Sequence, residues 1–157
     1  MGTITQRTRD SHVVATGMTS SEILEVLRTG SDARRAEAIR TIGPVQPDMP
    51  RALLEALCTR ARSDPDPAVR VLAVDALSVL GRHMSFVVRD VLLGLLHTDR
   101  DTTVRVHTAA ALRQFGGQAP AKLRAALAAF DASGDTELVG QQEHEGEFDE
   151  PSLPFQG

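Results

Sequence analysis

A segment of this chain occurs twice, displaced by 35 residues. The copies begin at Asp64 and Asp99, and both read Asp-x-Asp, then Val-Arg-Val, then Ala-Leu and a closing Gly. Self-similarity at a period of about 20–50 residues is typical of chains that stack one structural unit on the next. Such stacks present an extended surface rather than an enclosed pocket, so the repeat favours a protein that binds another macromolecule.

Each copy carries the signals of a helix that begins after a capping aspartate. Asp66 precedes Pro67, and proline suits the first helical position because the N–H that it lacks has no helical partner there. From Val69 onward, apolar side chains recur at the spacing of one helical face, and Gly81 follows as a stop. Similar signals elsewhere predict an all-α fold of seven helices, at about 19–30, 32–42, 47–62, 66–80, 85–97, 104–115 and 120–130.

Charge and polarity divide the chain into three parts. Residues 1–131 hold all 17 Lys and Arg residues and 14 acids, whereas residues 132–157 hold seven acids and no Lys or Arg. We expect residues 1–18 to be a flexible lead-in and residues 19–131 to form a short α-solenoid of about three antiparallel hairpins. Residues 132–157 have too few large apolar side chains to offset their ordering entropy, so an acidic, disordered tail is predicted.

Composition argues against several classes of protein. The chain has no Trp or Tyr, and its pI of about 5.7 does not favour nucleic-acid binding. Cys58 is the single cysteine, which excludes an internal disulfide and fits a reducing compartment. No apolar run approaches the length of a membrane span and no signal peptide is recognisable, so the sequence predicts a cytoplasmic protein without membrane insertion.

The repeated segment resembles the HEAT repeat family, in particular the short bacterial repeats first associated with phycobilisome lyases. The resemblance rests on Asp64, Asp66, Val69, Arg70, Ala73, Ala76, Leu77 and Gly81, which the second copy matches except for Thr108 in place of Ala73. A weaker first copy, from Ala38 to Gly43, lacks the Val-Arg signature. The resemblance covers about residues 19–131 and implies stacked helix pairs with binding roles.

In HEAT-like stacks, the repeated charged residues cap helices and bridge neighbouring repeats. The resemblance implies this structural role, rather than contact with a ligand, for Asp64, Asp66, Arg70, Asp99, Asp101 and Arg105.

HEAT stacks generally line their concave side with the second helix of each repeat, which makes that face the candidate partner-binding surface. We take Leu53, Leu57, Val88, Leu92, Leu123 and Leu127 as the core-facing columns, and a rotation of about 100° per residue then defines the outward rows. These rows predict a partner-binding site at Arg51, Glu55, Arg62, Phe86, Asp90, Leu93 and His97, and they also contain Cys58 and Ala121. The alternative is that a neighbouring helix covers Phe86 and Leu93.

No motif for catalysis, metal binding or a cofactor is recognisable in the sequence. No two histidines have the i, i+4 spacing of a helical metal site, and His107 is expected to be a satisfied, partly buried side chain. The predicted function is therefore a non-enzymatic protein-interaction module: an adaptor, scaffold or assembly factor that is one subunit of a larger assembly. The family resemblance leaves one alternative, a phycobilin-lyase-like subunit that is active only with a partner chain.

The end of the tail, residues 147–157, is a candidate docking peptide. Phe148, Leu153 and Phe155 stand among acids and two prolines, and proline favours an extended conformation. Such a peptide can bind a groove through side-chain anchors, either on a partner or on this protein's own basic body. A solvating tail without specific contacts is the third alternative.

Overall fold

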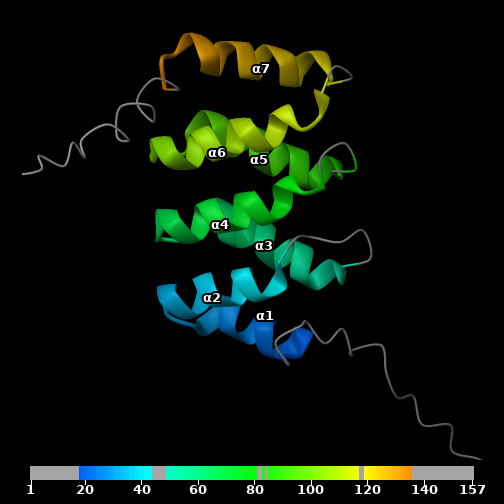
Figure 1. Ribbon diagram of the computed structural model, residues 1–157, viewed down its shortest axis with the longest axis vertical. Helices are drawn as coiled ribbons and strands as arrows, with labels where there is room; N and C mark the ends of the chain where they lie inside the picture. Colours follow the sequence, from blue (N-terminus) through cyan, green and yellow to red (C-terminus); the bar gives the residue numbers. More distant parts are fainter. Residues whose placement is uncertain (1–17, 44–48, 81–82, 84, 117–118, 136–157) are drawn as a thin grey trace, which may run out of the picture.

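The computed structural model describes residues 18–43, 49–80, 83, 85–116 and 119–135. Within these residues the chain folds into helices alone, in agreement with the predicted all-α class (Figure 1). The helices are α1 (Ser20–Thr29), α2 (Asp32–Ile42), α3 (Arg51–Ser63), α4 (Pro67–Ser78), α5 (Phe86–Thr98), α6 (Thr102–Arg113) and α7 (Ala121–Ala132).

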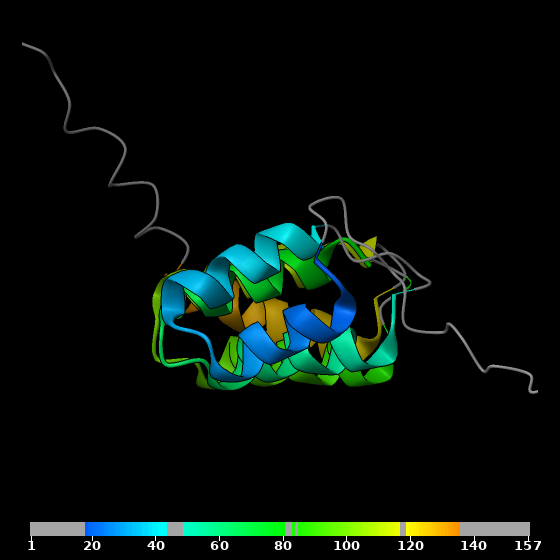
Figure 2. The ribbon, with the colours of Figure 1, turned by 90° about the horizontal axis from the view of Figure 1, so that it is seen from below.

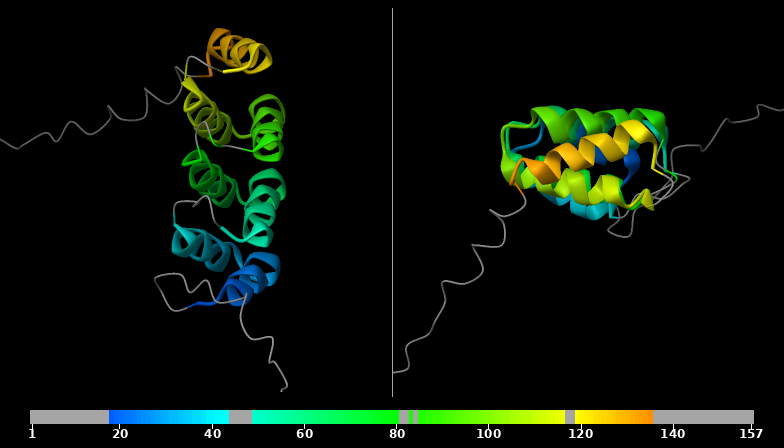
Figure 3. Two further views of the ribbon diagram at one scale, coloured as in Figure 1. Left: turned by 90° about the vertical axis from the view of Figure 1, so that its right-hand side faces the viewer. Right: turned by 90° about the horizontal axis from the view of Figure 1, so that it is seen from above.

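The helices form a two-layer stack. Helices α1, α3 and α5 pack in order as one layer, and α2, α4 and α6 pack as the other, so that the two layers appear as two columns (Figure 3). Helix α7 ends the stack and lies against both α5 and α6 (Figures 1 and 3). We call α1, α3, α5 and α7 the odd-helix layer, because α7 continues the order of packing along α5.

The closest antiparallel partners lie on either side of the short turns. Helices α1 and α2, α3 and α4, and α5 and α6 form three hairpins at three levels of the stack, and the view along the stack shows successive hairpins nearly superimposed (Figure 2). The sequence repeat instead starts at Asp64 and groups α4 with α5. The predicted solenoid of three hairpins is therefore present, with its pairing shifted by one helix because the turns at Asp64–Asp66 and Asp99–Asp101 are the tight ones.

Local signals define most helix ends. Thr19 and Glu22 form a reciprocal capping box at the start of α1. Asp66 caps α4 by accepting a hydrogen bond from the Ala68 amide, and Pro67 occupies the first turn of that helix. Gly43 ends α2 with a φ of 64°, a conformation that glycine adopts without a steric penalty. Several ends differ from prediction by two or more residues. Helix α3 begins at Arg51, α4 stops at Ser78, short of Gly81, α6 spans Thr102–Arg113 rather than 104–115, and α7 continues to Ala132.

The core lies between the two layers and runs the length of the stack. The fully buried side chains include one or more from each level, for example Ile23, Leu57, Leu77, Leu92, Leu112 and Leu123. Of the predicted core columns on α3, α5 and α7, all are buried except Leu127, which is partly buried and packs against the core. In the part of the chain that the structure describes, no helix has the length and hydropathy needed to cross a bilayer.

Candidate protein-binding face and the Arg–Asp ladder

One arginine in each hairpin level ties that level to the next. Arg70 on α4 donates from Nε and Nη2 to the two carboxylate oxygens of Asp99, both at 2.9 Å. Its Nη1 donates to the backbone carbonyl of Asp64, also at 2.9 Å. A bidentate arginine–carboxylate pair fixes both the distance and the relative orientation of its partners. Arg70 therefore connects the turn after α3 with the turn after α5.

The same arrangement occurs one level earlier and one level later. Arg35 on α2 donates to the Asp64 carboxylate at 2.7 and 2.8 Å and to the Gly30 carbonyl at 2.6 Å. Arg105 on α6 donates to the Asp135 carboxylate at 2.8 Å and to the Asp99 carbonyl at 2.7 Å. We call this continuous chain the Arg–Asp ladder; it consists of Gly30, Arg35, Asp64, Arg70, Asp99, Arg105 and Asp135.

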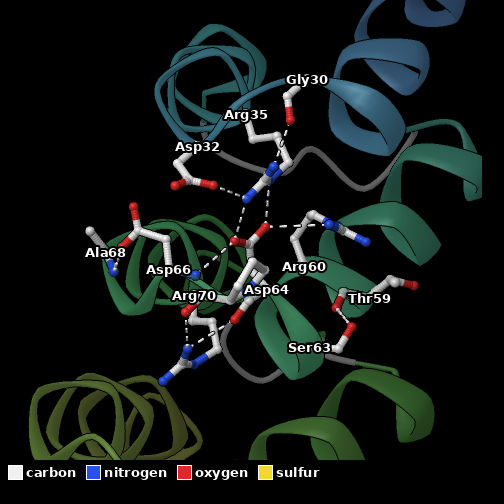
Figure 4. A network of polar contacts seen from close by, with 11 residues as sticks. Gly30, Asp32, Arg35, Thr59, Arg60, Ser63, Asp64, Asp66, Ala68 and Arg70 are labelled. Carbon is white, nitrogen blue, oxygen red and sulfur yellow. Dashed lines mark hydrogen bonds and ion pairs between the residues drawn. The ribbon is translucent and has the colours of Figure 1, made fainter.

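Asp64 shows how the ladder is connected to helix capping. Its carboxylate accepts bonds from Arg35, Arg60 and the Asp66 amide, while its carbonyl accepts from Arg70 (Figure 4). The Asp99 carboxylate bonds the Asp101 amide in the same way, and Asp101 caps α6 through the Val104 amide. The repeated charged residues of the sequence thus lie at the turns, where they cap helices and bridge successive levels.

The charges of the ladder are compensated within the fold. Burial alone would raise the pKa of Asp64, but its hydrogen bonds from Arg35 and Asp66, with the charges of Arg35 and Arg60, hold that pKa below its ordinary value. The hydrogen bond from Arg105 likewise lowers the pKa of Asp135. Among the described residues, every buried side-chain nitrogen and oxygen has a hydrogen-bond partner.

Sequence reasoning missed two charged residues of the ladder, Arg35 and Asp135. Arg35 lies 35 residues before Arg70 and keeps the arginine of the signature, although Arg34 replaces its valine, so the repeat period itself could have identified it. Asp135 falls within the segment predicted to be a disordered tail from 132 onward. The structure extends α7 to Ala132 and pairs Asp135 with Arg105, so the described fold continues beyond residue 131.

Grooves lie between successive helices of the odd-helix layer. The α3–α5 groove has a volume of about 720 Å³, the α5–α7 groove about 630 Å³ and the α1–α3 groove about 420 Å³. The exposed side of α5 separates the first two grooves, and Asp90, Gly94 and Thr98 line both of them. The solvent side of the odd-helix layer is therefore corrugated along its length.

Most of the predicted partner-binding residues lie on this face and are exposed. Arg51 and Glu55 are exposed and form an ion pair at 2.7 Å along α3. Asp90 lines both grooves of α5, whereas Arg62 lines the α3–α5 groove and His97 the α5–α7 groove. Phe86, at the start of α5, is 70% exposed. The structure thus brings these residues to one face, and nothing in the geometry identifies a partner.

The prediction is wrong for two residues of the outward rows. Leu93 is only 7% exposed and Cys58 only 3%. Leu93 lines the bottom of the α5–α7 groove beside Ala125 and Ala126, because α7 lies close enough to cover that side of α5. The alternative of a covering helix therefore holds for Leu93 and not for Phe86.

The predicted rows on α3 and α5 differ from the exposed ones at one member each, by one residue. Thr59 on α3 and Gly94 on α5 are exposed where Cys58 and Leu93 were expected, and these two residues are separated by the repeat period of 35. One residue corresponds to a rotation of about 100°, which changes a core position into a surface position. The helices packed against α5 decide which of its sides faces the core. The apolar pattern of α5 alone does not define that rotation about the helix axis.

Sequence analysis also missed the rest of the apolar patch on α5. Val87, beside Phe86, is 65% exposed and lines the α3–α5 groove. The Arg89 guanidinium lies 3.9 Å from the centroid of the Phe86 ring, a cation–π contact that covers part of that ring. Phe86 and Val87 together form the apolar patch of the odd-helix face.

The remaining reactive side chains have structural surroundings. Burial raises the pKa of the Cys58 thiol, which favours its unreactive protonated form. His107 is partly exposed, and its Nδ1 lies 2.8 Å from the Asp75 carboxylate, as expected for a satisfied histidine. No group of three or more potential metal ligands occurs in the described part of the chain.

The candidate docking peptide, residues 147–157 with Phe148, Leu153 and Phe155, lies outside the described residues, so its predicted role stays a prediction. The same holds for residues 1–17 of the predicted lead-in.

Stacked antiparallel helix pairs, linked level by level through their turns, define the chain as an α-solenoid. The sequence model of HEAT repeats matches it at residues 20–113 and again at 54–137, and the chain belongs to the HEAT repeat family. The match is to HEAT repeats in general and does not distinguish the phycobilisome-lyase kind. No curated protein and no solved structure matches the chain.

Proposed function

We propose that this protein is a non-enzymatic interaction module that binds a protein partner through the odd-helix face, as an adaptor, scaffold or assembly factor in the cytoplasm. HEAT repeats are generally protein-interaction modules, and that family membership supports binding rather than catalysis. The fold alone does not identify the partner, because one fold hosts many functions.

The observation that carries the proposal is the coincidence of grooves and apolar exposure on one face. Three grooves follow the odd-helix layer, and two of the largest exposed apolar side chains, Phe86 and Val87, lie at the start of α5 on that layer. Exposed apolar groups next to charged ones are typical of interaction sites, because their burial by a partner is favourable while the charges give orientation.

The apolar patch supplies a direct test. The double variant Phe86→Ser, Val87→Ser removes apolar area from two exposed side chains, so the fold is expected to persist while partner binding is lost. Full-length protein and variant are compared by affinity purification with quantitative mass spectrometry, after circular dichroism has shown equal helicity.

A matched control exists on the same chain. Val79, just after α4, is also a large exposed apolar residue, at 55%, but it lies outside the odd-helix layer. Val79→Ser should leave the set of co-purified proteins unchanged. Equal loss of partner in the control and in the double variant, or no loss in either, would contradict the proposed face.

A further inference from the structure

We infer that the α3–α5 groove is a binding site for an acidic peptide with apolar anchors, and that it is occupied by the chain's own C-terminal segment, residues 136–157. The interaction is intramolecular, so it can be tested without an external partner.

The first observation is the charge left uncompensated in the groove. Arg62 and Arg100 both line it, both are exposed, and neither forms an ion pair within the described residues. The aspartates beside them, Asp64 and Asp99, are already neutralised by the arginines of the ladder. The end of the groove at the turns therefore offers two free guanidinium groups, whereas the segment 136–157 carries six acids and no Lys or Arg.

The second observation is the place where the segment begins. A single guanidinium, that of Arg105, binds both the Asp135 carboxylate and the Asp99 carbonyl. Asp135 therefore lies beside the turn that contains Arg100, at the positive end of the groove. The 22 residues that follow can span about 70 Å when extended, so their length does not limit access to the groove.

The third observation is that the order of chemistry along the segment matches the order along the groove. A chain that enters at Arg100 meets the positive charges first and then the apolar patch at Val87. The segment presents its acids at 143–150 and then Leu153 and Phe155. From Arg100 back to Val87, α5 and its turn rise about 20 Å. From Glu147 to Leu153, six residues further on, an extended chain also spans about 20 Å.

Two residues of α5 refine this fit. Gly94 lies midway along the groove, and a methyl group added at its Cα would meet no atom within 4 Å. Internal packing thus does not require a glycine in this helix, where glycine is unfavourable by about 1 kcal/mol relative to alanine. A bound chain approaches α5 most closely there. Asp90, exposed one turn earlier, repels the acids and so favours the orientation with the apolar anchors beside it.

Paramagnetic relaxation in the full-length protein tests both occupancy and direction. Nitroxide labels are placed at Gln142→Cys or at Ser152→Cys, in a background where the buried Cys58 is replaced by alanine. The label at 142 should remove amide signals near Thr98 and Arg100, and the label at 152 should remove those from Val87 to Val91. The spectrum of the reduced, diamagnetic label checks that each variant is folded.

Charge variants supply the matched control. Replacing Arg62 and Arg100 by serine should restore the lost signals, because the groove then lacks its free guanidinium groups. Replacing Arg34 and Arg40 on α2, also exposed, removes the same number of arginines from the other layer and should leave the losses in place. Losses that are absent, that are the same for both labels, or that fall on α2, α4 and α6 overturn the inference. The nitroxide experiment uses the protein without any partner. A negative result would therefore overturn this inference and leave the proposed function to its own test by affinity purification.

Discussion

The turn edge and the odd-helix face of this stack are built from the same repeat but treat their charges in opposite ways. Along the turn edge, positions 35, 70 and 105 are all arginine. Each of these arginines binds an aspartate that lies one level further along the stack. Along the face, the positions equivalent to Phe86 are Arg51 and Ala121, so the side chain at that position changes from one repeat to the next. Residues that recur hold the levels together, whereas residues that vary within the repeat distinguish this protein's surface.

Burial follows the same division. The Arg70 and Asp99 side chains are 4% and 5% exposed, and a charge in such a place needs its partner. Arg62 is exposed and has no ion pair among the described residues, so no described side chain compensates its charge. Arginine is therefore expected to affect folding at the turn edge and binding on the odd-helix face.

The largest effect is expected from breaking the ladder at its centre. Arg70→Ala leaves the buried Asp99 carboxylate without its counter-charge and should lower the free energy of unfolding by about 3–5 kcal/mol. Arg62→Ala should change it by less than about 0.5 kcal/mol, as is usual for a surface substitution. Urea denaturation followed by circular dichroism measures both, and equal effects would remove the distinction between edge and face.

A substitution in the core gives a reference for the loss of stability expected from Arg70→Ala. Leu77 is fully buried between the layers, and Leu77→Ala should destabilise the protein by about 2–5 kcal/mol through lost burial and a cavity. Val79, two residues later and largely exposed, should tolerate alanine with less than about 0.5 kcal/mol of change. Thermal and urea unfolding of the two variants compare them, and a small effect at Leu77 would show that its helical face is not the core.

Acid should weaken the turn edge specifically. The folded pKa of Asp64 lies below its ordinary value of 3.8, so its contribution to stability is complete above that pH and is lost as the pH falls below it. Asp64→Asn should therefore be less stable than the wild type at neutral pH and should lose less stability on acidification. Urea midpoints from neutral pH down to about pH 2.5 give the two slopes. Parallel slopes would mean that Asp64 does not titrate with folding.

A small stability effect of opposite sign is expected on the face. Gly94→Ala should stabilise α5 by about 0.5–1 kcal/mol, because alanine is the better helix former and its methyl group meets no neighbour. The same methyl group should weaken whatever binds along the α3–α5 groove. Thermal unfolding and the nitroxide experiment report the two effects, and a stabilised variant with unchanged signal losses would separate Gly94 from the binding site.

Much of the fold was predictable because it depends on local signals. The caps at Thr19 and Asp66, the proline at 67 and the apolar face from Val69 each act within one or two turns of a helix. The 35-residue period then implies stacking, because one helix pair cannot bury its apolar faces alone. The exposure of the candidate residues was predictable for the same reason, since six of the seven helical ones are exposed, while their role in binding stays a prediction.

The sequence by itself determined the helices, their repetition and the charged residues at the turns. Only the tertiary structure decided that Leu93 is covered while Val87 is exposed, that Arg35 binds Asp64 across 29 residues, and that α7 carries the chain on to Asp135. The physical reason is that a helix's own periodicity defines its apolar side to within about one residue, or about 100°. The neighbouring helices fix the rotation that remains, and with it which side chains are left for a partner.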